Sequence, residues 1–315
     1  MKATWIEVVT IDGAAQLNAM NGDVILAVCR ARTPYLAIEF LKAHPEARTI
    51  KVAPHTKYYN FPESRQAVPK RSVKPQRLIE LENKIFGEEL LQLKALPEWD
   101  AYHYPEAKTT LHPCNNLKGT HEPEGVCVHF PVWTQAPSRV NDLARIRKDN
   151  GHAYLIMDGE GQIYQDQNTR QWGWHAGRGA WWRPLGTAIM SKALIGIEVC
   201  SWGRLGDRGD EDPRDPWGNV LKNTVSGRGI PSEHVMPGRY HQFTQAQLVS
   251  LTRWILWLNM HYDAFDLDNV VGHSEIATPH GRKSDPGHSM PCTMQEYREL
   301  LALLVEHHGL HKTGK

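Results

Sequence analysis

The chain has 315 residues, and its 36 Lys plus Arg nearly balance its 35 Asp plus Glu, which leaves a formal charge of +1. So small a net charge excludes a global field that would attract nucleic acid or an acidic membrane surface. The length exceeds that of a usual single domain, so we expect two domains, each large enough to bury a core.

The cysteines and the amino-terminal residues bear on two questions: whether the chain forms disulfides and whether it carries a secretory leader. The five cysteines are odd in number and show no CxxC spacing, which argues against a disulfide framework and against a zinc ribbon. Residues 1–7 lack a basic start followed by an apolar run, and no 18 consecutive residues are apolar. We therefore expect reduced, mostly buried thiols in a soluble chain that is made without a secretory leader.

The first hundred residues read as a small α/β pattern. We expect strands at 23–30 and 49–52 and a helix at 34–41. A basic, Pro-containing connector follows at 61–77, and then an amphipathic helix at 78–96. No motif in this part carries recognisable chemistry. We place a domain boundary near residue 105, between a first domain of residues 1–105 and a second of residues 106–315.

The second domain alternates strands and helices. We expect a strand that begins at Gly125 and runs through Phe130, a helix at 141–148, and two strands at 154–157 and 162–165 joined by a tight turn. The apolar segment 193–200 predicts a buried strand whose alternation turns Ile195, Ile197 and Val199 to one face and Glu198 to the other.

Segment 201–240 is rich in Gly, Pro, Asp and Arg, and it is too long for an ordinary connection. We interpret it as a surface insertion or active-site flap and expect it to be mobile. Two helices should follow. One begins at Thr244 with Gln247 three residues on, and the last begins at Thr293 with Glu296 three residues on, which is the spacing of a capping box.

The loop 272–287 gathers histidines, carboxylates and a lysine into one short stretch. Imidazole nitrogen and carboxylate oxygen are ligands of zinc, and a catalytic zinc site takes three of them from the protein. The loop offers two, and His129 on an upstream strand offers a third. The plain alternative is an ordinary loop, since its Gly, Pro, Ser and Asp are common loop formers and the chain holds 17 histidines.

Five motifs in a fixed order resemble the type-2 N-acetylmuramoyl-L-alanine amidases. The resemblance runs from about residue 120 to about 290 and does not touch the first hundred residues. The motifs are Val128-His129-Phe130, Trp174-His175-Ala176-Gly177, Ile195-Gly196-Ile197-Glu198, Phe243-Thr244-Gln245-Ala246-Gln247, and Gly272-His273-Ser274-Glu275-Ile276 with Gly281-Arg282-Lys283-Ser284-Asp285-Pro286-Gly287.

This resemblance implies a mixed central sheet flanked by helices and a hydrolase with one zinc ion per chain. It implies cleavage of the amide between N-acetylmuramic acid and the L-alanine of peptidoglycan or muropeptides. His129, His273 and Asp285 match the metal ligands. Glu198 matches the general base and Lys283 the catalytic lysine. His280 lies in the same loop and is the competing candidate for the third ligand.

Substrate contacts are expected from Trp174, His175 and Arg282. Tryptophans 172, 174, 181 and 182 surround His175 in the sequence, and flat indoles stack on the apolar faces of sugars. We expect one or two of the four at the groove and the rest in the core. The chain departs from the family pattern in the length of 201–240 and of the interval between His273 and Asp285, which affects the shape of the groove.

Three alternatives remain open at this stage. The fold has relatives that bind peptidoglycan without cutting it. A cysteine hydrolase would use Cys127 or Cys200, which share strand faces with His129 and Glu198. Glu198 itself has the plain interpretation of a carboxylate paired with a nearby arginine.

The expected partner is peptidoglycan or a muropeptide, with no nucleic acid and no insertion into a membrane. The first domain is the expected site for a delivery or immunity partner. Three routes suit a wall hydrolase without a leader: release through a holin, dedicated secretion, or a cytosolic role in muropeptide recycling.

Overall fold

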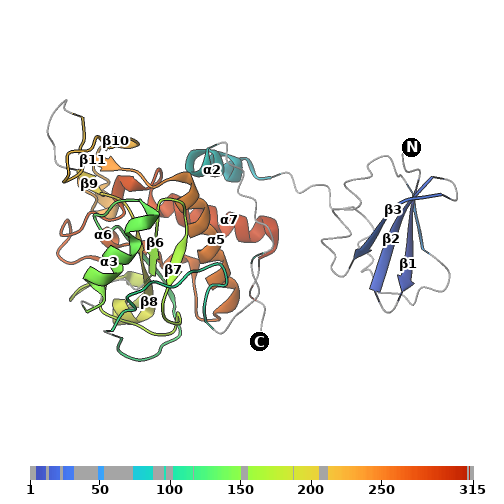
Figure 1. Ribbon diagram of the computed structural model, residues 1–315, viewed down its shortest axis with the longest axis horizontal. Helices are drawn as coiled ribbons and strands as arrows, with labels where there is room; N and C mark the ends of the chain where they lie inside the picture. Colours follow the sequence, from blue (N-terminus) through green and yellow to red (C-terminus); the bar gives the residue numbers. More distant parts are fainter. Residues whose placement is uncertain are drawn as a thin grey trace. The chain divides into compact units, whose positions relative to one another are not determined.

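The computed structural model describes part of the chain with side chains and part as backbone. Side chains are described for residues 74–87, 96, 102–115, 117–149, 155–186, 188–205, 212–310 and 312, and backbone alone for 5–11, 14–21, 24–31 and 49–52. The helix expected at 34–41 lies outside these ranges. The chain divides into two compact units, residues 1–71 and 72–315, and Figure 1 shows the elements of each.

The first unit contains a four-stranded sheet of order β3-β2-β1-β4. The strands are β1 Trp5–Ile11, β2 Ala14–Asn21, β3 Val24–Ala31 and β4 Thr49–Val52. Neighbouring strands are antiparallel except β1 and β4, which are parallel. Strands β3 and β4 match the segments expected from the sequence, whereas β1 and β2 were not foreseen.

A mixed five-stranded sheet of order β12-β5-β8-β6-β7 forms the centre of the second unit. The strands are β5 Gly125–His129, β6 Leu155–Met157, β7 Ile163–Gln165, β8 Leu194–Val199 and β12 Val270–Gly272. The first four strands of this order are parallel, and β7 returns antiparallel to β6. Strands β6 and β7 form the hairpin that was expected from the sequence. The Asp158 carboxylate stabilises its turn by accepting hydrogen bonds from the backbone N–H groups of Glu160 and Gln162.

Helices cover both faces of this sheet. They are α3 Val140–Arg147, α4 Met190–Ala193, α5 Gln245–His261, α6 His273–Ile276 and α7 Met294–His308. Figure 1 shows α3 and α5 on opposite sides of β6 and β7. Both expected capping boxes are present, at Thr244 with Gln247 and at Thr293 with Glu296. These boxes satisfy backbone donors that would otherwise lack partners at the helix starts.

Side-chain alternation divides the sheet into two kinds of face. Ile195, Ile197 and Val199 of β8 belong to the large core that includes Trp254 of α5 and Leu300 of α7. The intervening residues therefore point away from α5 and α7. The alternation expected for this strand is confirmed, and it places Glu198 on the face that carries the candidate site.

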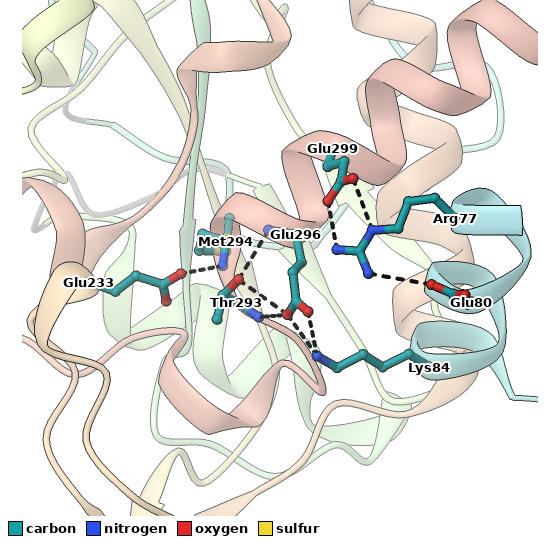
Figure 2. Close-up of polar contacts among 8 residues, drawn as sticks. All are labelled: Arg77, Glu80, Lys84, Glu233, Thr293, Met294, Glu296 and Glu299. Atoms are coloured by element: carbon teal, nitrogen blue, oxygen red, sulfur yellow. Dashed lines mark hydrogen bonds and ion pairs between the residues drawn. The ribbon is translucent and has the colours of Figure 1, made fainter. Parts of the chain in front are cut away.

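Helix α2, Gln76–Phe86, belongs to the second unit. Its four buried apolar side chains join the core that includes α5 and α7: Leu78, Leu81, Ile85 and Phe86. Figure 2 shows its outer side, where the Arg77 guanidinium donates to both oxygens of Glu299 at 2.9 and 2.8 Å and the Lys84 ammonium donates to Glu296.

The position of α2 differs from the sequence interpretation, which assigned residues 78–96 to the first domain with a boundary near residue 105. The four apolar side chains find their core in the second unit, so that unit begins at Ser72. The helix ends at Phe86. Residues 88–95 lie outside the described part.

The described residues of segment 201–240, called the insertion below, contribute to a small sheet of order β10-β11-β9, whose strand β11 extends to His241. Its strands are β9 Arg204–Leu205, β10 Thr224–Gly227 and β11 Gly238–His241. The buried Glu233 fixes the insertion to α7 by accepting the backbone N–H of Met294 at 2.6 Å, as Figure 2 shows. Within the described residues, no helix is both long and apolar enough to span a membrane.

Candidate active site

Three strand ends bring the candidate catalytic groups together. His129 is the last residue of β5, and in the parallel register it lies opposite Glu198 of β8. His273 follows directly after β12, the other neighbour of β5. The carboxyl ends of parallel strands meet at one edge of a sheet, and such edges commonly form binding sites in α/β folds.

His129, His273 and Asp285 form a buried triangle of ligand atoms. The two Nδ1 atoms are 3.0 Å apart, and each lies 3.0 Å from Asp285 Oδ2. The three residues are 4, 3 and 6% exposed. The Ser274 backbone N–H donates to the Asp285 carbonyl at 2.8 Å, which fastens the end of the loop to the start of α6. Residues 156 positions apart in the chain thus meet at one point.

Outer hydrogen bonds orient both imidazoles in the same way. His273 Nε2 lies 3.0 Å from the Ala176 carbonyl, which can only accept, so Nε2 carries the proton. His175 Nε2 likewise donates to the Leu194 carbonyl at 2.9 Å, which leaves His175 Nδ1 as an acceptor for His129 Nε2 at 3.0 Å. Both Nδ1 lone pairs therefore point into the triangle, which is the arrangement that metal-binding histidines need.

The surroundings of the triangle favour the protonation states that a metal ligand needs. Burial raises the pKa of Asp285, but the charges and hydrogen bonds of His273 and His129 outweigh burial and hold that pKa well below its usual value. Burial, together with His273, lowers the pKa of His129 to about 4. Near neutral pH the carboxylate is ionised and the His129 imidazole is neutral, as a metal ligand must be.

Glu198 is buried beside the triangle and is held by one of its two oxygens. Arg147 Nη1 donates to Oε1 at 2.5 Å, and Arg147 Nη2 donates to the Pro131 carbonyl at 3.1 Å. Glu198 Oε2 has no hydrogen-bond partner among the described residues. Burial raises the pKa of Glu198 to about 7, against the lowering effect of Arg147.

Arg147 is the site residue that the sequence interpretation did not name. It comes from the last turn of α3, 51 residues before Glu198. The plain interpretation of Glu198 as an arginine-paired carboxylate therefore describes one of its oxygens. The other oxygen, Oε2, stays available, so Glu198 can pair with Arg147 and still take part in proton transfer.

A cavity of about 280 Å³ joins these groups to solvent. Its lining includes every candidate residue except Trp174: His129, His175, Glu198, His273, Arg282, Lys283 and Asp285. Lys283 is half-buried, and the exposed Arg282 donates from Nε to the Thr278 carbonyl at 3.1 Å. His175 lines the cavity, but both of its ring nitrogens are engaged in orienting His129.

The four clustered tryptophans lie outside this lining. Trp174 and Trp181 are 44 and 54% exposed, while Trp172 packs edge-on against Trp174 and Trp182 lies beneath the Arg298 guanidinium. Two of the four are thus open to solvent.

Two competing interpretations can be placed in the structure as well. His280 is exposed and stacks on His234 of the insertion, with ring centroids 3.5 Å apart. Cys127 and Cys200 are fully buried, and burial raises the pKa of both thiols. Such thiols are poor nucleophiles, because the thiolate is the reactive form.

The family profile of the N-acetylmuramoyl-L-alanine amidases (Amidase_2) matches residues 119–288, which is more than half of the chain. The chain belongs to this family of peptidoglycan amidases.

Several solved structures are similar to this chain. They include a selenomethionine derivative of AmpD, with 20% identity over 65% of this chain and 99% of that chain and a TM-score of 0.39. AmpDh3 from Pseudomonas aeruginosa, in complex with anhydromuramic pentapeptide, shows 19% identity over 64% of this chain and 65% of that chain, with a TM-score of 0.37. A mutant endolysin from Bacillus subtilis shows 15% identity over 62% of this chain and 97% of that chain, with a TM-score of 0.33. No curated protein matches the sequence.

Proposed function

We propose that this amidase is zinc-dependent and hydrolyses the amide between the lactyl group of N-acetylmuramic acid and the L-alanine of the stem peptide. The observation that carries the proposal is the buried triangle of His129, His273 and Asp285, in which both imidazoles turn an unprotonated nitrogen inward.

The dimensions of the triangle suit zinc. Ligand bonds of ~2.0–2.1 Å in a tetrahedral site place the ligand atoms about 3.3 Å apart, close to the 3.0 Å separations here. His129 and His273 would bind through Nδ1 and Asp285 through Oδ2. This set leaves a fourth position for water, as catalytic zinc sites do.

A second group of possible ligands, Cys127, His129 and His175, shares His129 with the first. It suits a metal less well. Burial strongly disfavours the Cys127 thiolate that a metal would need, and the His175 Nδ1 lone pair is used by His129. We therefore assign the metal to the set that includes Asp285.

The surrounding residues supply the remaining chemistry. A bound zinc ion would supply a Lewis acid that polarises the carbonyl and acidifies water. The unpartnered Oε2 of Glu198 takes a proton from the attacking water and passes it to the leaving amine. Arg147 holds Oε1, which leaves Oε2 for the proton transfers. The Lys283 ammonium stabilises negative charge as it develops on the carbonyl oxygen.

Mass spectrometry of digests tests this function directly. The zinc-loaded protein should release stem peptides with a free L-alanine amino group, and a chelator should stop the release until zinc is restored. A non-catalytic binding module would bind peptidoglycan but release no peptide. Parallel digests of intact sacculi and soluble muropeptides would show which of the two is the substrate.

Replacement of Cys127 or Cys200 by serine should leave substantial activity. Both thiols are buried, and neither is assigned a part in the reaction. The measurement is turnover together with bound zinc for each variant. Loss of activity with zinc retained would favour the cysteine hydrolase instead.

Removal of residues 1–71 should leave the cleavage of small muramyl peptides intact, since every assigned residue lies in the second unit. A protein that starts near residue 105 should be far less stable, because it lacks the four buried apolar residues of α2. Each such burial is worth ~1.5–3 kcal/mol, against a total domain stability of ~5–15 kcal/mol.

Thermal unfolding and activity of the two truncated proteins decide this prediction. Equal stability would show that α2 contributes nothing to the second unit. Failure of the protein starting at Ser72 to cut a muramyl peptide would place part of the site in the first unit. We propose that residues 1–71 govern delivery or attachment to the wall, so their removal should reduce lysis of intact walls.

A further inference from the structure

Three tryptophans outside the cavity form one aromatic cluster. Trp133 follows the end of β5, while Trp202 and Trp217 belong to the insertion. The ring centroid of Trp217 lies 5.3 Å from that of Trp202 and 6.4 Å from that of Trp133, both edge-on. Trp202 is buried, Trp133 is half-buried, and Trp217 is 58% exposed. We call these three residues the aromatic rim.

The exposed Trp217 is held on a fixed turn. The Asp215 carboxylate accepts the backbone N–H groups of Trp217 and Asn219, each at 2.9 Å, and also the Asn219 side-chain amide at 2.9 Å. Arg214 donates to the Gly218 carbonyl at 2.7 Å. An indole that is already positioned loses little freedom on binding, so its burial by a ligand contributes more to affinity.

The aromatic rim continues the wall of the catalytic cavity. Val132 lines the cavity, is 54% exposed, and immediately precedes Trp133. Gly203, next to Trp202, packs so closely on Phe130 of the cavity lining that a Cβ atom there would lie 2.2 Å from the ring. A substrate that reaches out of the cavity past Val132 therefore meets the aromatic rim.

The cavity and the aromatic rim differ in charge. Arg282 and Lys283, from one loop, place two cations at the lining, and the third cation there, Arg147, is paired with Glu198. The three indoles of the aromatic rim are uncharged. The bond to be cut joins two unlike halves, a stem peptide with carboxylates and a glycan of uncharged N-acetyl sugars. Cations suit the first half, and indole faces suit the apolar faces of sugar rings.

We propose that Trp217, seated on Trp202 and Trp133, is a sugar-binding platform for the glycan beyond the muramic residue whose peptide is removed. This inference rests on the proposed function, because it divides the substrate of that reaction between two surfaces. It assigns to the insertion a role in preferring glycan chains over single muramyl peptides.

Two defined substrates test the platform in the full-length zinc-loaded protein. One is a single N-acetylmuramic acid carrying the stem peptide, and the other is a tetrasaccharide carrying the same peptide. Trp217→Ala should lower kcat/KM about tenfold on the tetrasaccharide, mainly through KM, as loss of a well-packed aromatic anchor does. The same variant should keep wild-type kcat/KM on the single sugar. Trp217→Phe should recover most of the loss.

Leu111→Ala is the control, because Leu111 is 77% exposed, does not line the cavity, and belongs to neither the insertion nor the aromatic rim. This variant should leave kcat/KM unchanged on both substrates. Equal losses on both substrates in Trp217→Ala, with zinc content and melting temperature unchanged, would overturn the platform. No loss on either substrate would also overturn it.

Failure of the proposed function gives a different result. A wild-type protein that cuts neither substrate would end the amidase assignment without deciding the platform. Fluorescence titration with a tetramer of N-acetylglucosamine then decides it: wild type should bind the tetramer, and Trp217→Ala should bind it about tenfold more weakly. Equal affinities would overturn the platform independently of catalysis.

Discussion

Glu198→Ala should lower turnover by about 10²- to 10⁴-fold, the usual contribution of a positioned acid or base, while the protein keeps its zinc and its fold. Glu198 lies beside the triangle but is not one of its members. The metal set therefore survives its removal, whereas the proton transfers to and from Oε2 do not. Steady-state turnover and zinc content, measured on the same preparation, check this result.

Glu198→Gln is the sharper companion variant, since it keeps the size of the side chain and an oxygen for Arg147 but cannot take a proton. It should be as slow as Glu198→Ala. Near-normal turnover of either variant in zinc-loaded protein would remove Glu198 from the mechanism.

The pH dependence has a definite sign. Burial raises the pKa of Glu198 to about 7 in the metal-free protein, against the charge of Arg147. A bound zinc cation favours the carboxylate and lowers this pKa. Only the carboxylate acts as a base, so turnover should fall as pH decreases, with an acid limb at or below pH 7. The residual activity of Glu198→Gln should lack that limb.

Asp285→Ala should remove most of the bound zinc, whereas His280→Ala should leave the zinc content near that of the wild type. The Asp285 carboxylate lies 3.0 Å from both inward-facing imidazole nitrogens. His280 is exposed and stacks on His234 instead. Loss of a direct ligand should exceed the ~10–100-fold decrease in affinity that follows loss of an outer hydrogen-bond partner.

Metal analysis of the two purified variants, with melting temperatures as a check on folding, decides the third ligand. The reverse pattern would assign that position to His280. Equal zinc loss in both variants would instead mean that the whole loop 277–285 must keep its conformation for the metal to bind.

Local signals in the sequence predicted much of the second unit. Thr244 and Thr293 begin helices because capping boxes act over three residues, and the alternation of 194–199 placed Glu198 on the correct face because strand geometry repeats every two residues. The loop containing His273 and Asp285 was also recognisable, since its ligand types are concentrated within one short stretch.

Contacts between distant segments were not predictable in this way. Arg147 meets Glu198 only because α3 covers the site face of the sheet. The role of His175 depends on the Leu194 carbonyl, a backbone group that no side-chain pattern reveals. The short strands of the insertion pair residues up to 36 positions apart, as Arg204 does with Tyr240, and their polar sequences lack the alternation of a half-buried strand.

The docking of α2 has a mechanical consequence. Any pull transmitted along the chain from residues 1–71 enters the second unit at this helix, the first of that unit. Its apolar side is embedded with α5 and α7, so that helical layer resists the load. The exposed pairs of Arg77 and Lys84 add resistance that salt would weaken. The triangle of His129, His273 and Asp285 lies across the sheet from this layer, so a pull on residues 1–71 would act on the helical face opposite the candidate catalytic groups.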